Sequence, residues 1–168
     1  MMTVRTRLWG VLARWWLFER KLSPTGESRL SMRCWWSDCD INRHMNNSRY
    51  LALMDVGRYH FILRSGLLAE LWRRRWFPVL VRAEVDFKRS IKPGERFVLE
   101  TAYERVGTKS AVLRQRFRVE GEIVAEALVT GLFLHRGRAQ ELRPMFDLYP
   151  HLAPEPSEPR SEAVPVPS

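Results

Sequence analysis

The polar side chains best suited to chemistry in this sequence lie between residues 37 and 67. The segment reads SDCDINRHMNNSRYLALMDVGRYHFILRSGL. Asparagine is a favoured helix N-cap, so a helix is expected to begin near Asn47. A helix start presents unpaired backbone N–H groups at the positive end of the helix dipole, and these groups can stabilise an oxyanion. Asp40 precedes that start and can serve as a base or nucleophile towards a carbonyl carbon, or can simply cap a turn.

A second carboxylate, Asp55, falls inside the predicted helix. Arg58 and Tyr59 follow it at i+3 and i+4, so an ordinary ion pair on the helix surface is one interpretation. Gly57 costs about 1 kcal/mol in a helix interior, which suggests that the helix approaches a sheet closely at this point. With such an approach, Asp55 would point into a cleft.

Other chemistries find less support in the spacing. Cys39 could act as a nucleophile with His44 as its base, but the sequence near them offers no evident third group to orient the pair. A metal site is disfavoured because the nearby carboxylates and histidines match no standard spacing, so we predict no metal. The glycine-rich loops that hold nucleotide phosphates are absent from the sequence.

The surrounding sequence predicts one strand, one long buried helix and then four antiparallel strands. Gly66 is expected to end the long helix, and alternating apolar residues mark the strands. The last strand is apolar on both faces, so we place it inside the sheet. The arginines of the third of these four strands should meet Glu100 across a hairpin. The predicted elements are a strand over 29–36, helices over 47–64 and 67–76, and strands over 78–90, 96–106, 110–120 and 122–136.

The two ends differ from this central domain, which we place at residues 23–140. Residues 1–22 form a basic amphipathic pattern, which predicts a helix that packs on protein or lies on an anionic membrane surface. Residues 141–168 hold seven of the ten prolines and two arginines against five carboxylates. This composition is typical of an extended acidic tail that is at least partly disordered.

Composition narrows the class of partner. The 168 residues carry 28 basic and 19 acidic side chains, a net charge of +9. A balance this basic favours phosphates, nucleic acid or an acidic membrane surface. Nucleic acid is not predicted, because no motif that reads it is present. The two cysteines fit no disulfide framework, which favours a reducing, cytoplasmic location.

The segment D-C-D-x-x-x-H-M-N-N-S-R-Y-L-x-x-x-D-x-x-R resembles the hot-dog-fold acyl-CoA thioesterases of the 4-hydroxybenzoyl-CoA thioesterase type. Their usual form is D-x-D-x-x-G-H-V-N-N-x-x-Y-L-x-x-x-E-x-x-R. The resemblance covers residues 29 to about 137 and is closest to the thioesterase superfamily member six subgroup. It implies an α+β fold in which a long central helix is wrapped by a five-stranded antiparallel sheet. It also implies a homodimer or tetramer, active sites between subunits and no cofactor beyond the coenzyme A thioester substrate.

The resemblance carries roles to individual residues. Asp40 matches the catalytic aspartate, the backbone N–H near Asn47 matches the oxyanion donor, and Asp55 matches the catalytic glutamate of another branch. The sequence departs from the pattern where Arg43 replaces a glycine, which either narrows the site or offers a cation to coenzyme A phosphates. The residues expected to contact substrate are Arg43, His44, Asn46, Tyr50 and Arg58.

Two functions of different kinds follow. The first is hydrolysis of a fatty or aromatic acyl-CoA thioester, with Asp40 acting as general base or nucleophile. The alternative is a non-catalytic protein that binds acyl-CoA or lipid at the inner face of a membrane, with the N-terminal helix making a peripheral contact. A hydratase of the same fold is disfavoured, because D-I-N-R-H lacks the proline of the hydratase motif and is one residue too short.

Overall fold

The computed structural model describes Thr6, Gly10 and residues 26–147 of the chain. The predicted helix over residues 1–22 and most of the predicted tail lie outside the described residues. In chain order the elements are β1 (Ser28–Arg33), the short 3₁₀ helix η1 (Trp36–Asp38), α2 (Asn47–Ser65), α3 (Leu67–Arg74), β2 (Phe77–Phe87), β3 (Arg96–Val106), β4 (Ser110–Val119), β5 (Glu122–His135), β6 (Arg138–Ala139) and α4 (Arg143–Phe146).

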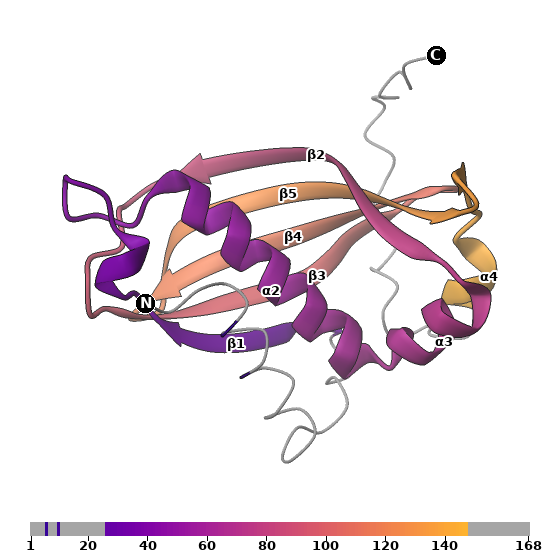
Figure 1. Cartoon of the computed structure of the whole chain (residues 1–168), viewed down its shortest axis with the longest axis horizontal. Coiled ribbons are helices and arrows are strands. Elements are labelled where there is room, and N and C mark those ends of the chain that lie inside the picture. The colour runs from indigo at the N-terminus through magenta and orange to yellow at the C-terminus, as the bar shows by residue number, and fades with distance from the viewer. Residues whose placement is uncertain (1–5, 7–9, 11–25, 148–168) are drawn as a thin grey trace.

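One antiparallel sheet curves around the long helix α2 (Figure 1). The strands are arranged in the order β1-β3-β4-β5-β2, and the two-residue β6 adds to β5. β5 therefore lies between two neighbours, as its apolar character on both faces predicts. The predicted α+β class, with a long helix wrapped by a five-stranded antiparallel sheet, is confirmed; β6 is a small addition.

Helix α2 begins and ends where the sequence predicts. Asn46 is its N-cap, with a side-chain oxygen that accepts a hydrogen bond from the Ser48 N–H at 2.9 Å. Gly66 ends the helix in the left-handed conformation, with φ of 78°. Such caps satisfy backbone groups that a helix leaves without partners at its ends.

Gly57 brings α2 against the sheet. A Cβ atom at this position would lie 2.6 Å from Cδ2 of Leu99 on β3 and 3.1 Å from the side-chain nitrogen of Gln115 on β4. Real Cβ atoms essentially never show the shorter of these contacts, so a larger residue would require the Leu99 side chain or the helix to shift. The close approach that the glycine predicts is confirmed.

Aromatic rings fill the space between helix and sheet in two buried clusters. In the larger, the Tyr50 ring meets Phe87 and Phe117 edge-on, with centroids 5.0 and 4.9 Å apart. In the smaller, the Tyr103 ring contacts Phe61 at 5.1 Å. Edge-to-face pairs of this kind add stability beyond the apolar area that they bury.

Charged side chains pair across the strands on the other face of the sheet. Glu100 lies opposite Arg116 in the β3–β4 register, and its Oε2 accepts a hydrogen bond from Nε of Arg118 at 2.8 Å. The predicted meeting of Glu100 with an arginine of β4 is therefore confirmed. Arg116 itself donates to Glu126 at 2.5 Å, and this hydrogen bond lowers the pKa of Glu126.

Two boundaries differ from the sequence prediction. β1 stops at Arg33, and Trp36 belongs to a 3₁₀ turn with 70% of its surface exposed, so it does not share the buried strand face. The domain also extends past residue 140. Leu142 and Met145 are fully buried, and the Phe146 ring contacts Tyr103 at 5.0 Å. These apolar side chains, which the sequence prediction places in the tail, complete the smaller cluster.

Strand β2 is exposed along almost its whole length. Among the described strands it pairs only with β5, and apolar side chains on both of its faces reach the surface. Phe77 is 68% exposed and Val81 is 54% exposed. Long exposed apolar edges are rare in single chains, because their unpaired N–H and C=O groups readily pair with another strand. Among the described residues, no helix has the length and apolar content needed to cross a bilayer.

Candidate functional site

Asp40 lies at the start of a tight turn between the 3₁₀ helix and α2. Its backbone N–H donates to the His44 carbonyl at 3.0 Å, and its carbonyl accepts from the Arg43 N–H at 3.0 Å. One carboxylate oxygen, Oδ1, accepts from the Asn42 N–H at 2.8 Å. Among the described residues, nothing donates to the other oxygen, Oδ2, and the side chain is exposed. Asp40 therefore shapes its turn and still presents one oxygen to solvent.

Arg43 adopts a backbone conformation that favours glycine. Its φ is +57°, in the left-handed region, where a side chain costs roughly 1 kcal/mol or more. Glycine, which the family pattern quoted above has at this position, adopts this conformation without that cost. Arg43 is exposed, and it forms no ion pair with any residue that the structure describes. Its guanidinium is thus available to an anion.

The start of α2 has one backbone donor without an acceptor. Asn46 N–H donates to the Asp38 carbonyl, and the Asn46 side chain satisfies Ser48 N–H. Within the described part of the chain, no hydrogen bond uses the Asn47 N–H. This donor sits at the first position of a 19-residue helix, where the helix dipole favours negative charge. Its role as an oxyanion donor stays a prediction.

The other residues predicted to contact substrate lie in different surroundings. His44 is half-buried, and its carbonyl closes the Asp40 turn. Tyr50 is only 2% exposed, and its hydroxyl accepts a hydrogen bond from the Ile91 N–H at 3.3 Å. Burial raises the pKa of Tyr50. The substrate contact of Tyr50 stays a prediction, and its place in this fold is that of a core residue.

Asp55 lies two turns further along α2 and is tied to the core through Arg58. An Asp55 carboxylate oxygen pairs with one Arg58 nitrogen, and a second Arg58 nitrogen donates to Oε1 of Gln115 at 2.8 Å. Gln115 is fully buried and donates to the Met54 carbonyl at 3.0 Å and to the Thr101 hydroxyl at 3.1 Å. Burial lowers the pKa of Arg58, and the Asp55 carboxylate opposes that shift. A continuous chain of bonds therefore fixes Asp55 to the sheet.

Gln115 did not stand out in the sequence, although a signal was present. The inward face of β4 holds Ala111, Leu113, Gln115, Phe117 and Val119, and only one of the five is polar. A polar amide at an inward position must find partners in the core, because an unsatisfied buried group costs about 1–3 kcal/mol.

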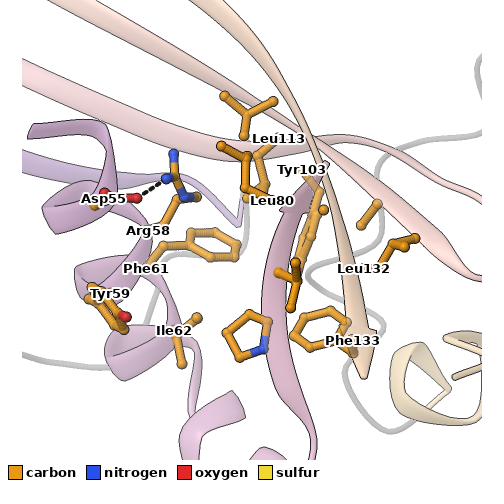
Figure 2. Close-up of a pocket in the computed structure, with 15 residues that line it drawn as sticks. Asp55, Arg58, Tyr59, Phe61, Ile62, Leu80, Tyr103, Leu113, Leu132 and Phe133 are labelled. Carbon is orange, nitrogen blue, oxygen red and sulfur yellow. Dashed lines mark hydrogen bonds and ion pairs between the residues drawn. The ribbon is translucent and has the colours of Figure 1, made fainter. Parts of the chain in front are cut away.

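A cleft of about 120 Å³ opens beside Asp55 and Arg58 (Figure 2). The ion pair lies on the helix side, and apolar side chains from α2 and the strands form the rest of the wall. Burial raises the pKa of Tyr103, which lies in this wall. The Asp40 turn does not line this cleft. The apolar lining comprises Phe61, Ile62, Pro78, Val79, Leu80, Tyr103, Ala111, Leu113, Val129, Leu132 and Phe133.

The structure thus divides the predicted site residues into two groups. Asp40, Arg43, His44, Asn46 and Asn47 share the turn and the start of α2, whereas Asp55 and Arg58 share the cleft. In the part of the chain that the structure describes, no group of three or more His, Cys, Asp or Glu side chains is arranged to hold a metal ion.

Comparison with known families matches residues 34–167 to the Thioesterase-like superfamily. This match covers well over half of the chain, and it includes both groups of site residues. The chain belongs to the thioesterase-like superfamily. The hot-dog fold, the helix-start turn and the Asp55 cleft are therefore features of a member of this superfamily.

Individual proteins similar to this chain are consistent with membership of the superfamily. Protein THEM6 of Drosophila melanogaster is 33% identical over 102 residues, covering 60% of this chain and 53% of that protein. The chain thus spans about half the length of this relative. The long-chain acyl-CoA thioesterase FadM of Escherichia coli is 25% identical over 93 residues, covering 54% of this chain and 70% of that protein. The crystal structure of YbaW, a probable thioesterase from Escherichia coli, superposes with a TM-score of 0.69 at 20% identity, covering 75% of this chain and 98% of that one. The structural match supports the fold.

Proposed function

We propose that this protein hydrolyses acyl-CoA thioesters. The observation that carries the proposal is the Asn47 N–H, a helix-start donor with no acceptor among the described residues, on the same segment as the open oxygen of Asp40. Membership of the thioesterase-like superfamily supports the same reaction class.

In this mechanism the thioester carbonyl oxygen accepts a hydrogen bond from the Asn47 N–H. Asp40 either takes a proton from the attacking water or attacks the carbonyl carbon itself. Negative charge develops on the carbonyl oxygen, and the helix terminus stabilises it. The carbon–sulfur bond then breaks, coenzyme A leaves as its thiolate and takes up a proton, and the acid product is released. In the nucleophile route, water afterwards cleaves the acyl–Asp40 anhydride.

The cleft beside Asp55 is suited to the acyl group. Its wall is apolar apart from the Asp55–Arg58 pair and tyrosine hydroxyls, so a hydrocarbon chain can leave water there at a gain of roughly 0.8 kcal/mol per methylene. The name of the relative FadM, a long-chain acyl-CoA thioesterase, favours a fatty acyl group over an aromatic one.

Coenzyme A phosphates need cations, and several arginines of α3 and of the sheet are already paired with carboxylates. Arg89 pairs with Glu95, Arg114 with Glu104 and Arg116 with Glu126. Glu70 takes both Arg73 and Arg74, whose hydrogen bonds lower its pKa to about 2. Arg43, exposed beside Asp40 and without an ion pair among the described residues, is the better candidate for a phosphate contact.

A homodimer formed through β2 would complete the site. Within residues 26–147 the edge of β2 has no second partner strand, and the cleft lining includes Pro78, Val79 and Leu80 of the same strand. Because the Asp40 turn does not line the cleft of its own chain, we place the turn of one protomer against the cleft of its partner.

Sedimentation velocity tests this assembly. Val81→Lys, which puts a charge on the exposed edge, is expected to shift the protein from dimer to monomer and to reduce turnover. Leu128→Lys is the matched control: Leu128 is 37% exposed on β5, opposite Glu84 and Arg114 in the sheet register. Equal dissociation of both variants would contradict a β2 interface.

The activity is tested by the release of coenzyme A thiol from short, medium, long and aromatic acyl-CoAs. Turnover that rises with chain length and then falls when the chain exceeds the cleft supports a fatty acyl substrate. Binding without turnover on every substrate would instead favour the non-catalytic acyl-CoA-binding alternative, which the engagement of Asp55 by Arg58 makes reasonable.

Contact with a membrane through residues 1–22 stays a prediction from sequence, as does a cytoplasmic location. Co-sedimentation with anionic liposomes, comparing the full chain with a chain that starts at Ser23, tests the contact. Equal sedimentation of the two chains would contradict a membrane contact through residues 1–22.

A further inference from the structure

The sulfur atoms of Cys34 and Cys39 lie 3.6 Å apart, close enough for one thiol to donate to the other. Neither cysteine is in a disulfide. A disulfide requires the sulfurs to approach to about 2.05 Å, which is a movement of roughly 1.5 Å. We propose that these residues form a dithiol site that a small disulfide, such as glutathione disulfide, oxidises to an intramolecular disulfide.

A local turn brings the two thiols together. The 3₁₀ helix folds the chain back, so that the Trp35 carbonyl accepts from the Cys34 thiol at 3.9 Å and from the Cys39 thiol at 3.5 Å. The buried Asp38 side chain fixes the turn by accepting from the Trp35 N–H at 2.8 Å. The backbone turn thus brings the two cysteines together, and the contacts with the Trp35 carbonyl position their sulfurs.

Both ends of this turn are anchored. The Cys34 backbone N–H donates to the Glu95 carbonyl at 2.9 Å, and its carbonyl accepts from the Gly94 N–H at 2.8 Å. Cys39 forms an isolated β-bridge with Met45, which precedes α2. These contacts hold the sulfurs near each other, so ring closure requires little rearrangement of the backbone.

The two thiols differ in access. Cys34 is 1% exposed, whereas Cys39 is partly exposed. The Cys39 thiolate therefore attacks the small disulfide first, forming a mixed disulfide and releasing one glutathione as its thiolate. The Cys34 thiolate then attacks the Cys39 sulfur and releases the second glutathione. Two electrons pass from the protein sulfurs to glutathione disulfide, and the two thiol protons end on the released glutathiones.

The site directly precedes Asp40 in the chain, so the disulfide would close a ring at the base of the proposed catalytic turn. Any effect of that ring on turnover rests on the proposed thioesterase function. The sulfur chemistry does not, and it can be tested without an activity assay.

The test is equilibration of the reduced full chain with a series of glutathione redox ratios, followed by acid quenching, alkylation and intact mass measurement. The wild type is expected to change from two alkylated thiols to none, with the loss of two hydrogens and no retained glutathione. Peptide mapping should place the new bond between residues 34 and 39.

Two variants separate the steps. Cys34→Ser is expected to accumulate one glutathione on Cys39, because the resolving thiol is gone. Cys39→Ser is expected to stay reduced, because the remaining thiol is buried. Wild type that keeps two alkylated thiols at ratios that modify Cys34→Ser would overturn the proposal, as would wild type that retains glutathione. If Cys34→Ser does not fold, the wild-type peptide map alone decides.

Discussion

Asp40 precedes helix α2 and Asp55 lies within it, and the structure holds the two carboxylates in different ways. Asp40 is positioned by bonds to residues within four positions of itself, and one of its oxygens stays open. Asp55 is positioned through Arg58 and the buried Gln115, which connects to β3 and the body of α2. Asp55 is also more than half exposed, but its paired oxygen is held by an arginine, whereas no cation pairs with Asp40 among the described residues. We therefore propose that Asp40 performs the chemical step and that Asp55 positions the substrate.

The largest expected effect is on Asp40. Asp40→Asn keeps the size and an oxygen for the Asn42 N–H but removes the base, so turnover should fall at least about a hundredfold. Steady-state kinetics on the best acyl-CoA substrate measures this loss. Asn42→Ala is the control, because it leaves the backbone N–H in place and should change turnover little. Near-normal turnover of Asp40→Asn would reverse the assignment of the two carboxylates.

The hydrogen bonds of buried Gln115 should stabilise the fold. Gln115→Ala removes a buried amide that bonds with Arg58, Met54 and Thr101, so the free energy of unfolding should fall by about 2 kcal/mol. Chemical denaturation at a fixed protomer concentration measures this change in the free energy of unfolding.

Gln140→Ala is the matched control, because that side chain makes one local bond to the Arg138 carbonyl. It should change stability by less than about 0.5 kcal/mol. Equal effects of the two substitutions would mean that the core network does not hold Asp55 in the way described.

A smaller loss of activity is expected at Asp55. Asp55→Asn removes the charge that Arg58 pairs with at the mouth of the cleft but keeps the side-chain shape. The value of kcat/KM should fall about tenfold, mainly through KM, because the change disturbs positioning and not the base. If Asp55→Asn abolishes turnover while Asp40→Asn does not, the mechanism of the other thioesterase branch applies.

The smallest effect concerns the turn itself. Arg43→Gly relieves a left-handed backbone, so the free energy of unfolding should rise by about 0.5–1 kcal/mol, and the KM for acyl-CoA should rise if the guanidinium binds phosphate. Thermal denaturation and kinetics measure the two effects. Arg43→Ala separates them, since it loses the charge and keeps the unfavourable backbone. A matching rise in stability for Arg43→Ala would show that strain is not the cause.

The sequence predicts the local features of this molecule well. Asn46 and Gly66 mark the ends of α2 because caps depend on neighbouring residues alone, and alternation places the strands because side-chain direction repeats every two residues. The motif also locates Asp40 and Asn47. What the sequence did not provide depends on long-range packing: the bonds of Gln115, the burial of Phe146 and the contact of two thiols. The exposure of β2 could not be predicted either, because its alternating pattern predicts one covered face, whereas neither face of the strand is buried in the structure.

The one-sided pairing of β2 should affect the hydrogen exchange of its individual amides. Ten of its eleven residues pair with β5, with an irregularity at Val81, and the other edge has no partner strand in the described part of the chain. On either side of Val81, backbone N–H groups therefore alternate between pairing with β5 and pointing away from the sheet. In a solitary chain these outward amides should exchange with deuterium quickly while their neighbours exchange slowly, giving an alternating pattern along the strand. A second β2 docked on the edge would slow the fast positions and erase the alternation. The exchange pattern of this one strand therefore reports, residue by residue and without any substitution, how the edge is occupied in solution.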